Sequence, residues 1–315
     1  MNSKKEDVIS NPQNKQMFIN LLSETICQDG IEIKHAPGDA DVLIVQTAVA
    51  CSTTASTVVV GEDTDLLILL CYHTRPGEGY DIYFKPESKM GTKKQQRCWD
   101  IKMTQRVLGG DVCSHMLFVH AVLGCDTTSR AHGIGKGVAL KQLMCNSAFK
   151  EQAGIFLKGS STVADVVEAG EKALICLYNG KTDESLDTLR LQRFYHKVKL
   201  SSSVQLQSLP PTSAATQYHS MRVYHQVQEW QGNELPPDEW GWKIHGPHFM
   251  PIMTTKEVAP KSLLSIISCN CKSGCSTMRC SCRKAGLECS PGCGECRGLC
   301  RNASQSETDG NDSLD

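Results

Sequence analysis

The stretch TVVVGEDTDLLILL, residues 57–70, decides the predicted fold of this 315-residue chain. Its first four residues, Thr57–Val60, have the β-branched composition of a buried strand. An acidic turn follows directly and leads into a second apolar run. Upstream, Ile31–His35 alternates like a strand, and Asp39 opens a helix that is apolar on nearly all sides. Strand, helix and strand in this order predict an α/β fold with a parallel sheet.

Periodicity and turn residues predict further elements along the chain. Met17, Phe18 and Leu21 have the spacing of an amphipathic helix, which continues through Leu22 to Ile26. A capping box, Thr162-x-x-Asp165, begins another helix. The remaining predicted elements are a hairpin formed by Tyr80–Phe84 and Asp100–Met103, and helices at His115–Leu123, 183–200 and 214–231.

Composition divides the chain into five predicted parts. A hydrophobic content of 40% with 21% charged residues is typical of a mostly globular protein. Both ends are polar, which predicts disorder. The parts are residues 1–13 (disordered), 14–180 (the α/β domain), 181–260 (a helical and irregular linker region), 261–302 (a cysteine-rich module) and 303–315 (a disordered tail).

Charge and hydropathy exclude several classes of protein. The formal net charge is −1, so any surface that binds polyanions must be local. No apolar run reaches 18 residues, so no membrane span and no membrane partner are expected. The N-terminal residues have no signal-peptide core. The cytosol or the nucleus is therefore the expected compartment.

The distribution of the 17 cysteines separates metal ligands from ordinary thiols. Eight are scattered, several of them in apolar contexts, and are expected to be buried free thiols. The other nine fall within 32 residues, and a reducing compartment favours metal ligation over disulfides for such a cluster. The nine predicted zinc ligands are Cys269, Cys271, Cys275, Cys280, Cys282, Cys289, Cys293, Cys296 and Cys300.

Nine thiolates allow two arrangements of tetrahedral zinc, which takes four ligands. They can form two separate sites with one cysteine left over, or three sites in which three sulfurs bridge. The short Cys-x-Cys steps favour the three-zinc cluster. Three Zn²⁺ and nine thiolates carry a charge of about −3, and seven Lys/Arg against two Glu in residues 261–302 bring the loaded module to about +2. The cationic rim, Lys272, Arg279, Arg283, Lys284, Arg297 and Arg301, suits weak phosphate contact.

The segment CNCKSGCSTMRCSCRKAGLECSPGCGECRGLCRN resembles the tesmin-type CXC domain, a family of small zinc-cluster modules in chromatin and DNA-binding proteins. The resemblance covers about 34 residues and implies zinc binding, a nuclear location and contact with DNA or chromatin. DNA-reading members often carry Tyr before the fourth cysteine, where this chain has Arg279, and often have two CXC units instead of one. A zinc knot used for protein contact stays open as the alternative.

Three acidic motifs lie in the first 130 residues: Asp39-Ala40-Asp41, Glu62-Asp63-Thr64-Asp65 and Asp126. The second follows a predicted strand, and functional crevices of parallel sheets lie at the carboxyl ends of strands. Carboxylates that converge there repel one another unless a hard cation such as Mg²⁺ or Mn²⁺ neutralises them. Two such ions support displacement at a phosphodiester. Taken singly, each motif is also explained by helix capping or turn chemistry.

The order of these motifs resembles the flap-endonuclease/XPG-type branch of the PIN-like nucleases. The motifs stand here as Ala36-Pro37-Gly38-Asp39-Ala40-Asp41, as Val60-Gly61-Glu62-Asp63-Thr64-Asp65, and as Gly124-Cys125-Asp126 followed by Gly133-Ile134-Gly135-Lys136-Gly137. The resemblance implies that Asp39, Asp41, Asp63, Asp65 and Asp126 bind Mg²⁺ or Mn²⁺. It also implies that Gly133, Gly135, Lys136 and Gly137 hold a nucleic-acid phosphate. In the CXC module, the cationic rim supplies Lys272, Arg279, Arg283 and Lys284 as the candidate phosphate contacts.

Family members begin with a strand that bears a metal-binding Asp, and nothing before Asp39 matches it. The expected fold is therefore an α/β, parallel-sheet domain of this type without its first strand, followed by the linker region and the zinc module. Two functions remain open. One is a divalent-metal-dependent, structure-selective nuclease. The other is a non-enzymatic zinc protein, associated with chromatin or with other proteins, that carries a degenerate nuclease-like scaffold.

Overall fold

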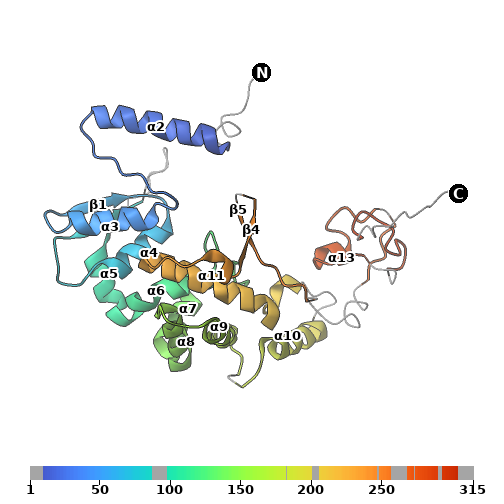
Figure 1. The fold of residues 1–315 in the computed structure, drawn as a ribbon. Coiled ribbons are helices and arrows are strands. Elements are labelled where there is room, and N and C mark those ends of the chain that lie inside the picture. The colour runs from blue at the N-terminus through green and yellow to red at the C-terminus, as the bar shows by residue number, and fades with distance from the viewer. Residues whose placement is uncertain are drawn as a thin grey trace.

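The protein is described by a computed structural model that places residues 10–86, 98–181, 183–200, 206–246, 248–256, 268–272, 274–289 and 293–303 (Figure 1). Helices dominate, and two small sheets accompany them, so the predicted α/β class is confirmed. Among the described residues, no helix is both long enough and apolar enough to cross a membrane. The predictions of disorder for residues 1–9 and 304–315 fall outside the described residues.

The strands lie in two groups along the chain: β1, β2 and β3 in the first half, and β4 and β5 in the second half. The first half contains α2 (Pro12–Gln28), α3 (Asp41–Cys51), β1 (Thr57–Val60), α4 (Thr64–His73), β2 (Ile82–Lys85), β3 (Trp99–Asp100), α5 (Ile101–Leu108), α6 (Gly110–Leu123) and α7 (Lys136–Cys145). The second half contains α8 (Ser147–Leu157), α9 (Val163–Leu177), α10 (Leu186–Leu200), η1 (Leu206–Ser208), α11 (Ser213–Gln231), η2 (Pro237–Glu239), β4 (Trp242–His245), β5 (His248–Pro251) and α13 (Ser281–Lys284).

The first sheet has the strand order β1-β2-β3. β1 and β2 are parallel, with Thr57 opposite Ile82, and β2 and β3 are antiparallel. The predicted pairing of Tyr80–Phe84 with the chain near Asp100 is thus confirmed in part. Beyond Asp100 the chain is helical instead, because the Asp100 carboxylate accepts a hydrogen bond from the backbone N–H of Met103 at 2.8 Å and caps α5.

Two sequence predictions about this sheet are wrong. Ile31–His35 forms no strand, and its alternation of residue types has no sheet partner in the described chain. β1 was predicted to be buried, but the side chains of Val58 and Val60 remain 55% and 58% exposed. Within the described sheet β1 pairs on one side only, so a run of β-branched residues is compatible with an exposed face here.

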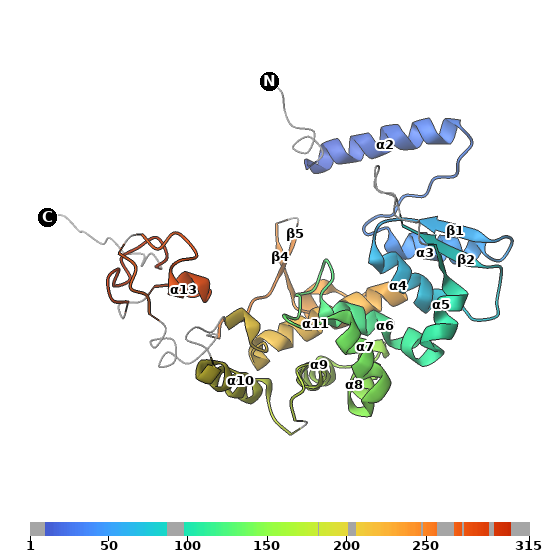
Figure 2. The ribbon, with the colours of Figure 1, turned by 180° about the vertical axis from the view of Figure 1, so that it is seen from behind.

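Helix α2 forms where its periodicity predicts, but it packs on nothing in the described core. The Asn11 side chain caps it by accepting from the backbone N–H groups of Gln13 and Asn14, and Pro12 occupies the first turn, where its missing N–H costs nothing. Pro12 and Gln13 are therefore helical rather than disordered. None of its residues is buried, and Figures 1 and 2 show the helix apart from the others.

The main core is built by α6, α8, α9 and α11, which pack on one another below the first sheet (Figure 2). Phe118 of α6 contacts Phe156 of α8 with ring centroids 4.5 Å apart. α11 lies in the segment predicted to be a linker region, yet it places Tyr224, Val227 and Trp230 in this core. Twelve of its nineteen residues are buried, and several of these are polar. Because buried positions carry polar residues, the sequence of α11 shows no apolar face that would predict its place in the core.

Short polar side chains cap the N-terminal ends of α9 and α11. Thr162 and Asp165 form the predicted capping box of α9, in which each side chain bonds the other residue's backbone N–H. Thr212 caps α11 in a similar way by accepting from the N–H of Ala215 at 3.2 Å. These short polar side chains satisfy donors that a helix leaves unpaired at its start.

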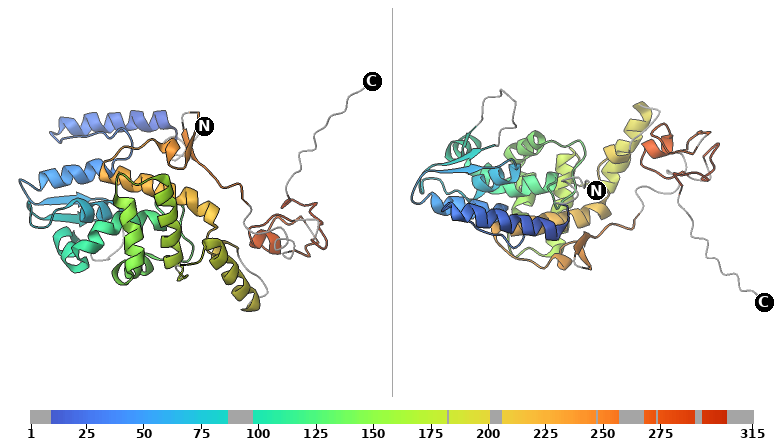
Figure 3. Two further views of the ribbon diagram at one scale, coloured as in Figure 1. Left: turned by 60° about the horizontal axis from the view of Figure 1, so that its bottom comes forward. Right: turned by 90° about the horizontal axis from the view of Figure 1, so that it is seen from above.

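The cysteine-rich module forms a separate cluster with its own centre (Figure 3). Leu287 touches the remainder of the chain, where it joins a small apolar cluster with Phe194, Leu206 and Leu209. Outside the module, the expectation of buried thiols holds for Cys71, Cys113 and Cys176 and is wrong for the others, which are exposed or half-buried: Cys27, Cys51, Cys98, Cys125 and Cys145.

Candidate metal centres

The acidic turn after β1 is shaped by its own residues. Gly61 follows the strand in a tight position, since a Cβ placed there would lie 2.7 Å from the side chain of Leu66. Asp63 then caps α4, accepting a hydrogen bond from the backbone N–H of Asp65 at 2.9 Å. Asp65 therefore stands in the first turn of α4, where the helix dipole favours negative charge.

The structure brings the acidic motifs together. Asp41 begins α3, and the Asp39 carboxylate accepts from its backbone N–H at 3.2 Å. Carboxylate oxygens of Asp41, Asp63 and Asp65 all lie within 4.8 Å of one another. Asp126 also acts electrostatically on Asp41 from the turn after α6. Five carboxylates from three separate segments thus share one region, which is compatible with a hard divalent cation.

The pKa of Asp41 records this crowding. Partial burial has the largest effect and raises the pKa of Asp41. The negative charges of the neighbouring carboxylates raise it further, to about 6; these are Asp39, Asp63, Asp65 and Asp126. Like charges in one place disfavour ionisation unless a cation is present. The site is therefore one in which a bound cation would relieve repulsion that already exists.

His120 contacts the acidic cluster, and sequence reasoning missed it. Its Nε2 donates to Oδ1 of Asp65 at 2.5 Å, and its ring stacks on Trp230 with centroids 5.7 Å apart. Burial alone would raise the pKa of Asp65, but the hydrogen bond and the charge of His120 lower it overall, with help from Lys136. The sequence offered one signal, a histidine inside the apolar run of α6, which a core residue explains equally well.

The predicted glycine turn lies beside the same cluster. Gly133 adopts a positive φ of 76°, a conformation that suits glycine, and Gly135 is the N-cap of α7. Lys136 follows in the first turn, and its Nζ lies 3.4 Å from Oγ1 of Thr64 in α4. Gly137 has open space around it. A cation and free backbone N–H groups therefore flank the carboxylates, as a phosphate-binding element requires.

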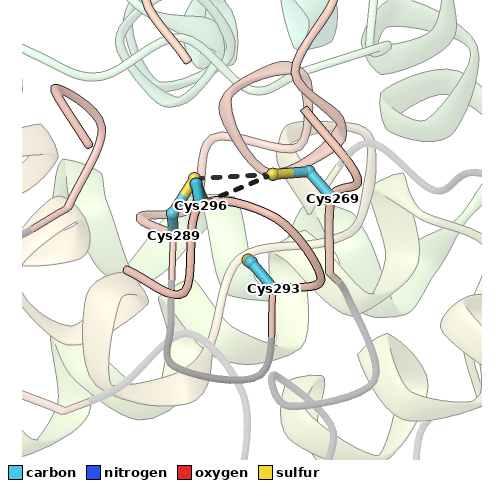
Figure 4. Close-up of side chains that lie close together, drawn as sticks. All are labelled: Cys269, Cys289, Cys293 and Cys296. Carbon is cyan, nitrogen blue, oxygen red and sulfur yellow. Dashed lines mark hydrogen bonds between the residues drawn. The ribbon is translucent and has the colours of Figure 1, made fainter. Parts of the chain in front are cut away.

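The described cysteines of the module form no disulfides and lie close together. Sγ of Cys269 lies 3.8 Å from the sulfurs of Cys275, Cys289 and Cys296, and Sγ of Cys280 lies 3.7 Å from that of Cys289. A disulfide would hold its sulfurs about 2 Å apart. Four sulfurs at about 2.3 Å from one zinc ion lie about 3.8 Å from each other. Figure 4 shows Cys269, Cys289, Cys293 and Cys296 directed toward a common centre.

The possible zinc sites overlap rather than separate. Cys269 and Cys289 each belong to three of the four groups of mutually close sulfurs found in the described residues. The groups are Cys269/Cys271/Cys275/Cys280, Cys269/Cys280/Cys282/Cys289, Cys269/Cys289/Cys293/Cys296 and Cys275/Cys289/Cys296/Cys300. All nine predicted ligands take part, and the cluster can hold zinc. Sulfurs that recur between groups are placed to bridge neighbouring ions.

Burial of the cysteine cluster favours the binding of cations. Six of the nine cysteines are buried, and Leu287 is the one other hydrophobic side chain that packs against them among the described residues. Burial raises the pKa of the Cys269 thiol to about 11, which disfavours a bare thiolate. A core of this composition buries too little hydrocarbon to hold a segment of this length by itself, so metal binding and folding are expected to be coupled.

The predicted cationic rim lies on the outside of the module. Lys272, Arg279, Arg283 and Lys284 are all exposed, the last two on α13. Exposed Lys and Arg side chains are available for phosphate contact.

Comparisons of the chain with protein-family models, with curated proteins and with solved structures found no match.

Proposed function

We propose that this chain is a divalent-metal-dependent, structure-selective nuclease of the PIN-like, flap-endonuclease type, whose CXC-type zinc module contacts DNA or chromatin in the nucleus. One observation carries the proposal: carboxylates of Asp41, Asp63 and Asp65, from two segments of the chain, lie within 4.8 Å of one another. Lys136 and the glycine turn beside them supply the positive side of a phosphodiester site.

The residues divide the work as follows. Mg²⁺ or Mn²⁺, when bound, would activate water and stabilise charge on the phosphodiester. Asp41, Asp63 and Asp65 would hold the ion, and Asp39 and Asp126 would complete the negative potential around it. Lys136 and the N–H groups that begin α7 would orient a phosphate of the substrate. His120 would keep the Asp65 carboxylate in place.

The test is cleavage of flap and single-stranded DNA and RNA with Mg²⁺ or Mn²⁺. Asp63→Asn and Asp41→Asn are expected to lower the rate by at least about a hundredfold, as the loss of a group that positions a catalytic ion does. Asp238→Asn, an exposed carboxylate in η2, is the matched control and should leave the rate unchanged. Equal rates for all variants would contradict the proposal. Absence of cleavage by a zinc-loaded, folded chain would favour the non-enzymatic alternative.

The zinc module is proposed to hold three ions that share three sulfurs. The recurrence of the same sulfurs in four overlapping groups supports this arrangement. Zinc analysis of the full chain is expected to give about three ions per chain, following four ligands per ion. Binding of a duplex oligonucleotide should weaken with salt and with Arg283→Gln and Lys284→Gln together. One or two zinc ions per chain would contradict the three-zinc arrangement. Salt-insensitive binding of the oligonucleotide would contradict phosphate contact by the module.

A further inference from the structure

Asn302 lies two positions beyond the last cysteine of the module and contacts two of its sulfur atoms. Its side-chain Nδ2 donates to Sγ of Cys289 at 3.4 Å. Its backbone N–H donates to the sulfur of Cys300. Its backbone carbonyl accepts a hydrogen bond from the N–H of Cys289 at 2.6 Å. Asn302 therefore joins the part of the module that contains Cys289 to the part that carries Cys300.

Both hydrogens of the Asn302 amide nitrogen have acceptors. Besides the Cys289 sulfur, Nδ2 donates to the backbone carbonyl of Leu287 at 2.8 Å. Because a carbonyl oxygen only accepts, this bond fixes which end of the amide is nitrogen. Leu287 packs against both the sulfur cluster and the apolar patch that contains Leu206 and Leu209. The amide thus also holds the residue through which the module contacts the remainder of the chain.

Cys289 is one of the two most widely shared sulfurs of the module. It is buried and belongs to three of the four groups of mutually close sulfurs. Its Sγ lies 3.8 Å from that of Cys269 and 3.7 Å from that of Cys280. Figure 4 shows it directed toward the centre that it shares with Cys269 and Cys296. Since a buried thiolate has little water around it, a hydrogen-bond donor from the protein stabilises its charge.

The donor to Cys289 differs in kind from the donors to other sulfurs of the module. Cys269 accepts a hydrogen bond from the backbone N–H of Cys271. Cys280 accepts one from the backbone N–H of Arg283. Every residue except proline supplies such an N–H, so these bonds do not depend on a particular side chain. The Cys289 sulfur instead accepts from a side chain thirteen residues away, and this contact requires asparagine.

The charge of the proposed three-zinc cluster explains why a neutral donor suits this place. Three Zn²⁺ ions and nine thiolates carry a charge of about −3. An amide N–H directed at a sulfur offsets part of that charge and orients the ligand. A carboxylate of the same size would only accept hydrogen bonds and would add negative charge. Asparagine at position 302 therefore fits the chemistry of the cluster, whereas aspartate does not.

We propose that Asn302 is a positioning residue of the zinc cluster, whose amide holds the Cys289 sulfur where it bridges neighbouring zinc ions. Because Asn302 also contacts Cys300, it acts most directly on the ion of the group Cys275, Cys289, Cys296 and Cys300. Loss of the amide loosens that ion and, through the shared Cys289, the neighbouring ions. This inference rests on the proposed zinc cluster and does not depend on the proposed nuclease activity.

Nuclear magnetic resonance of the full chain, labelled with ¹⁵N and loaded with ¹¹³Cd²⁺ in place of zinc, detects the hydrogen bond itself. A scalar coupling is expected between ¹¹³Cd and a side-chain amide proton of Asn302, because the N–H···S bond connects that proton to a metal-bound sulfur. Asn270 is the internal control, since it lies in the same module, is exposed and donates to no sulfur among the described residues. Its amide protons should show no coupling.

Substitutions at the same two positions measure what the amide contributes to zinc affinity. Asn302→Leu keeps the approximate size of the side chain and removes the donor. The zinc affinity of the full chain, measured by competition with a chelator, is expected to fall by about 10- to 100-fold. Asn302→Asp should lower it further, because it adds a negative charge beside the thiolates. Asn270→Leu is the matched control and should keep the affinity of the unmodified chain.

The outcomes separate this inference from the zinc cluster on which it rests. A chain that binds no zinc would overturn both. Zinc binding without a coupling to Asn302 in the cadmium-loaded chain would overturn the role of the amide alone, and so would equal zinc affinities of Asn302→Leu and Asn270→Leu. If Asn302→Leu holds no metal at all, the coupling in the unmodified chain still decides whether the amide contacts a metal-bound sulfur.

Discussion

Asp41 is the residue at which the repulsion in the acidic cluster is most evident. Its pKa is raised to about 6 by burial and by four neighbouring carboxylates. A carboxyl group with a raised pKa in the folded state binds protons more tightly there than in the unfolded state. Its unfavourable contribution is therefore fully present above about pH 6 and fades as the pH falls toward the ordinary value of 3.8.

Replacing Asp41 by Asn should thus stabilise the metal-free protein at pH 7.5, and the gain should shrink at pH 5. Thermal unfolding of both proteins at the two pH values measures this. Mg²⁺ or Mn²⁺ should raise the unfolding temperature of the unmodified chain at pH 7.5 and should have a smaller effect on the variant. A variant that is less stable than the unmodified chain at pH 7.5 would contradict the repulsion argument.

The hydrogen bond between Asp65 and His120 should stabilise the folded protein at neutral pH, in contrast to the repulsion at Asp41. A hydrogen bond to a charged group contributes about 1.5–3 kcal/mol, so a double-mutant cycle with Asp65→Asn and His120→Phe should give coupling of this size at pH 7. Because the pKa of Asp65 is lowered in the folded state, the coupling is present above 3.8 and is lost as the pH falls through the lower value. Urea unfolding measures it. His120→Phe combined with Asp238→Asn should be additive.

At the scale of elements, the crossing of α9 and α11 sets the shape of the main core. Gly170 of α9 is in contact with α11, and a Cβ there would lie 1.9 Å from Oγ and 2.5 Å from Cβ of Ser220. Rotation of the serine side chain moves Oγ but not Cβ, so the two helices would have to separate. The position accepts glycine because the backbones approach closely, not because the helix needs flexibility.

Gly170→Ala is therefore expected to destabilise the protein by about 1–3 kcal/mol, despite the better helix propensity of alanine. Gly154→Ala is the matched control: Gly154 lies in α8, and nothing lies within 4 Å of an added Cβ. That variant should stabilise the protein by roughly 0.5–1 kcal/mol. Denaturant unfolding of the two variants should give shifts of opposite sign, and equal shifts would refute the packing argument.

Helix α2 illustrates an element that local sequence forms without tertiary support. Its cap and its apolar spacing are both present, yet Met17, Phe18 and Leu21 remain 71%, 49% and 61% exposed. Most of the stability of a helix in a protein comes from tertiary packing of its apolar face rather than from helix propensity. Within the described chain, α2 thus contributes little to global stability compared with α9, whose Leu174 is 1% exposed.

At the scale of the whole molecule, the main feature is that the described chain forms two separate cores, one apolar and one made of cysteine sulfurs. The apolar core of the α/β part and the sulfur core of the module are distinct clusters, joined through the small patch around Leu287. We expect the sulfur core to depend on bound metal and the apolar core not to, so the two should respond differently to chelation.

Removal of zinc with a strong chelator should unfold residues 268–303 and leave the unfolding of the apolar core almost unchanged. Limited proteolysis and thermal unfolding, each followed with and without the chelator, measure the two responses. Cys280→Ser should mimic the chelator, whereas Cys27→Ser, an exposed cysteine of α2, should have no effect. A single transition that shifts as a whole would show that the two cores are coupled.

The spacing of residues was enough to predict several features. The grouping of the nine cysteines, the cap of α9, the strand β1 and the helices α6 and α10 all depend on neighbours within a few positions, and the sequence displays those directly. The acidic residues from Asp39 to Asp65 were also recognisable as a set, since a strand end and a helix start place them locally.

Only the tertiary structure decided which of these features meet. His120 lies 55 residues from Asp65, and α11 enters the core with buried polar side chains whose partners are distant backbone carbonyls. The strand-like pattern of Ile31–His35 had no partner among the described strands, and the apolar pattern of α2 found no face to cover. A pattern encodes what one segment can form. Burial and long-range hydrogen bonds, which depend on other segments, decide what that segment contacts and whether it stabilises the fold.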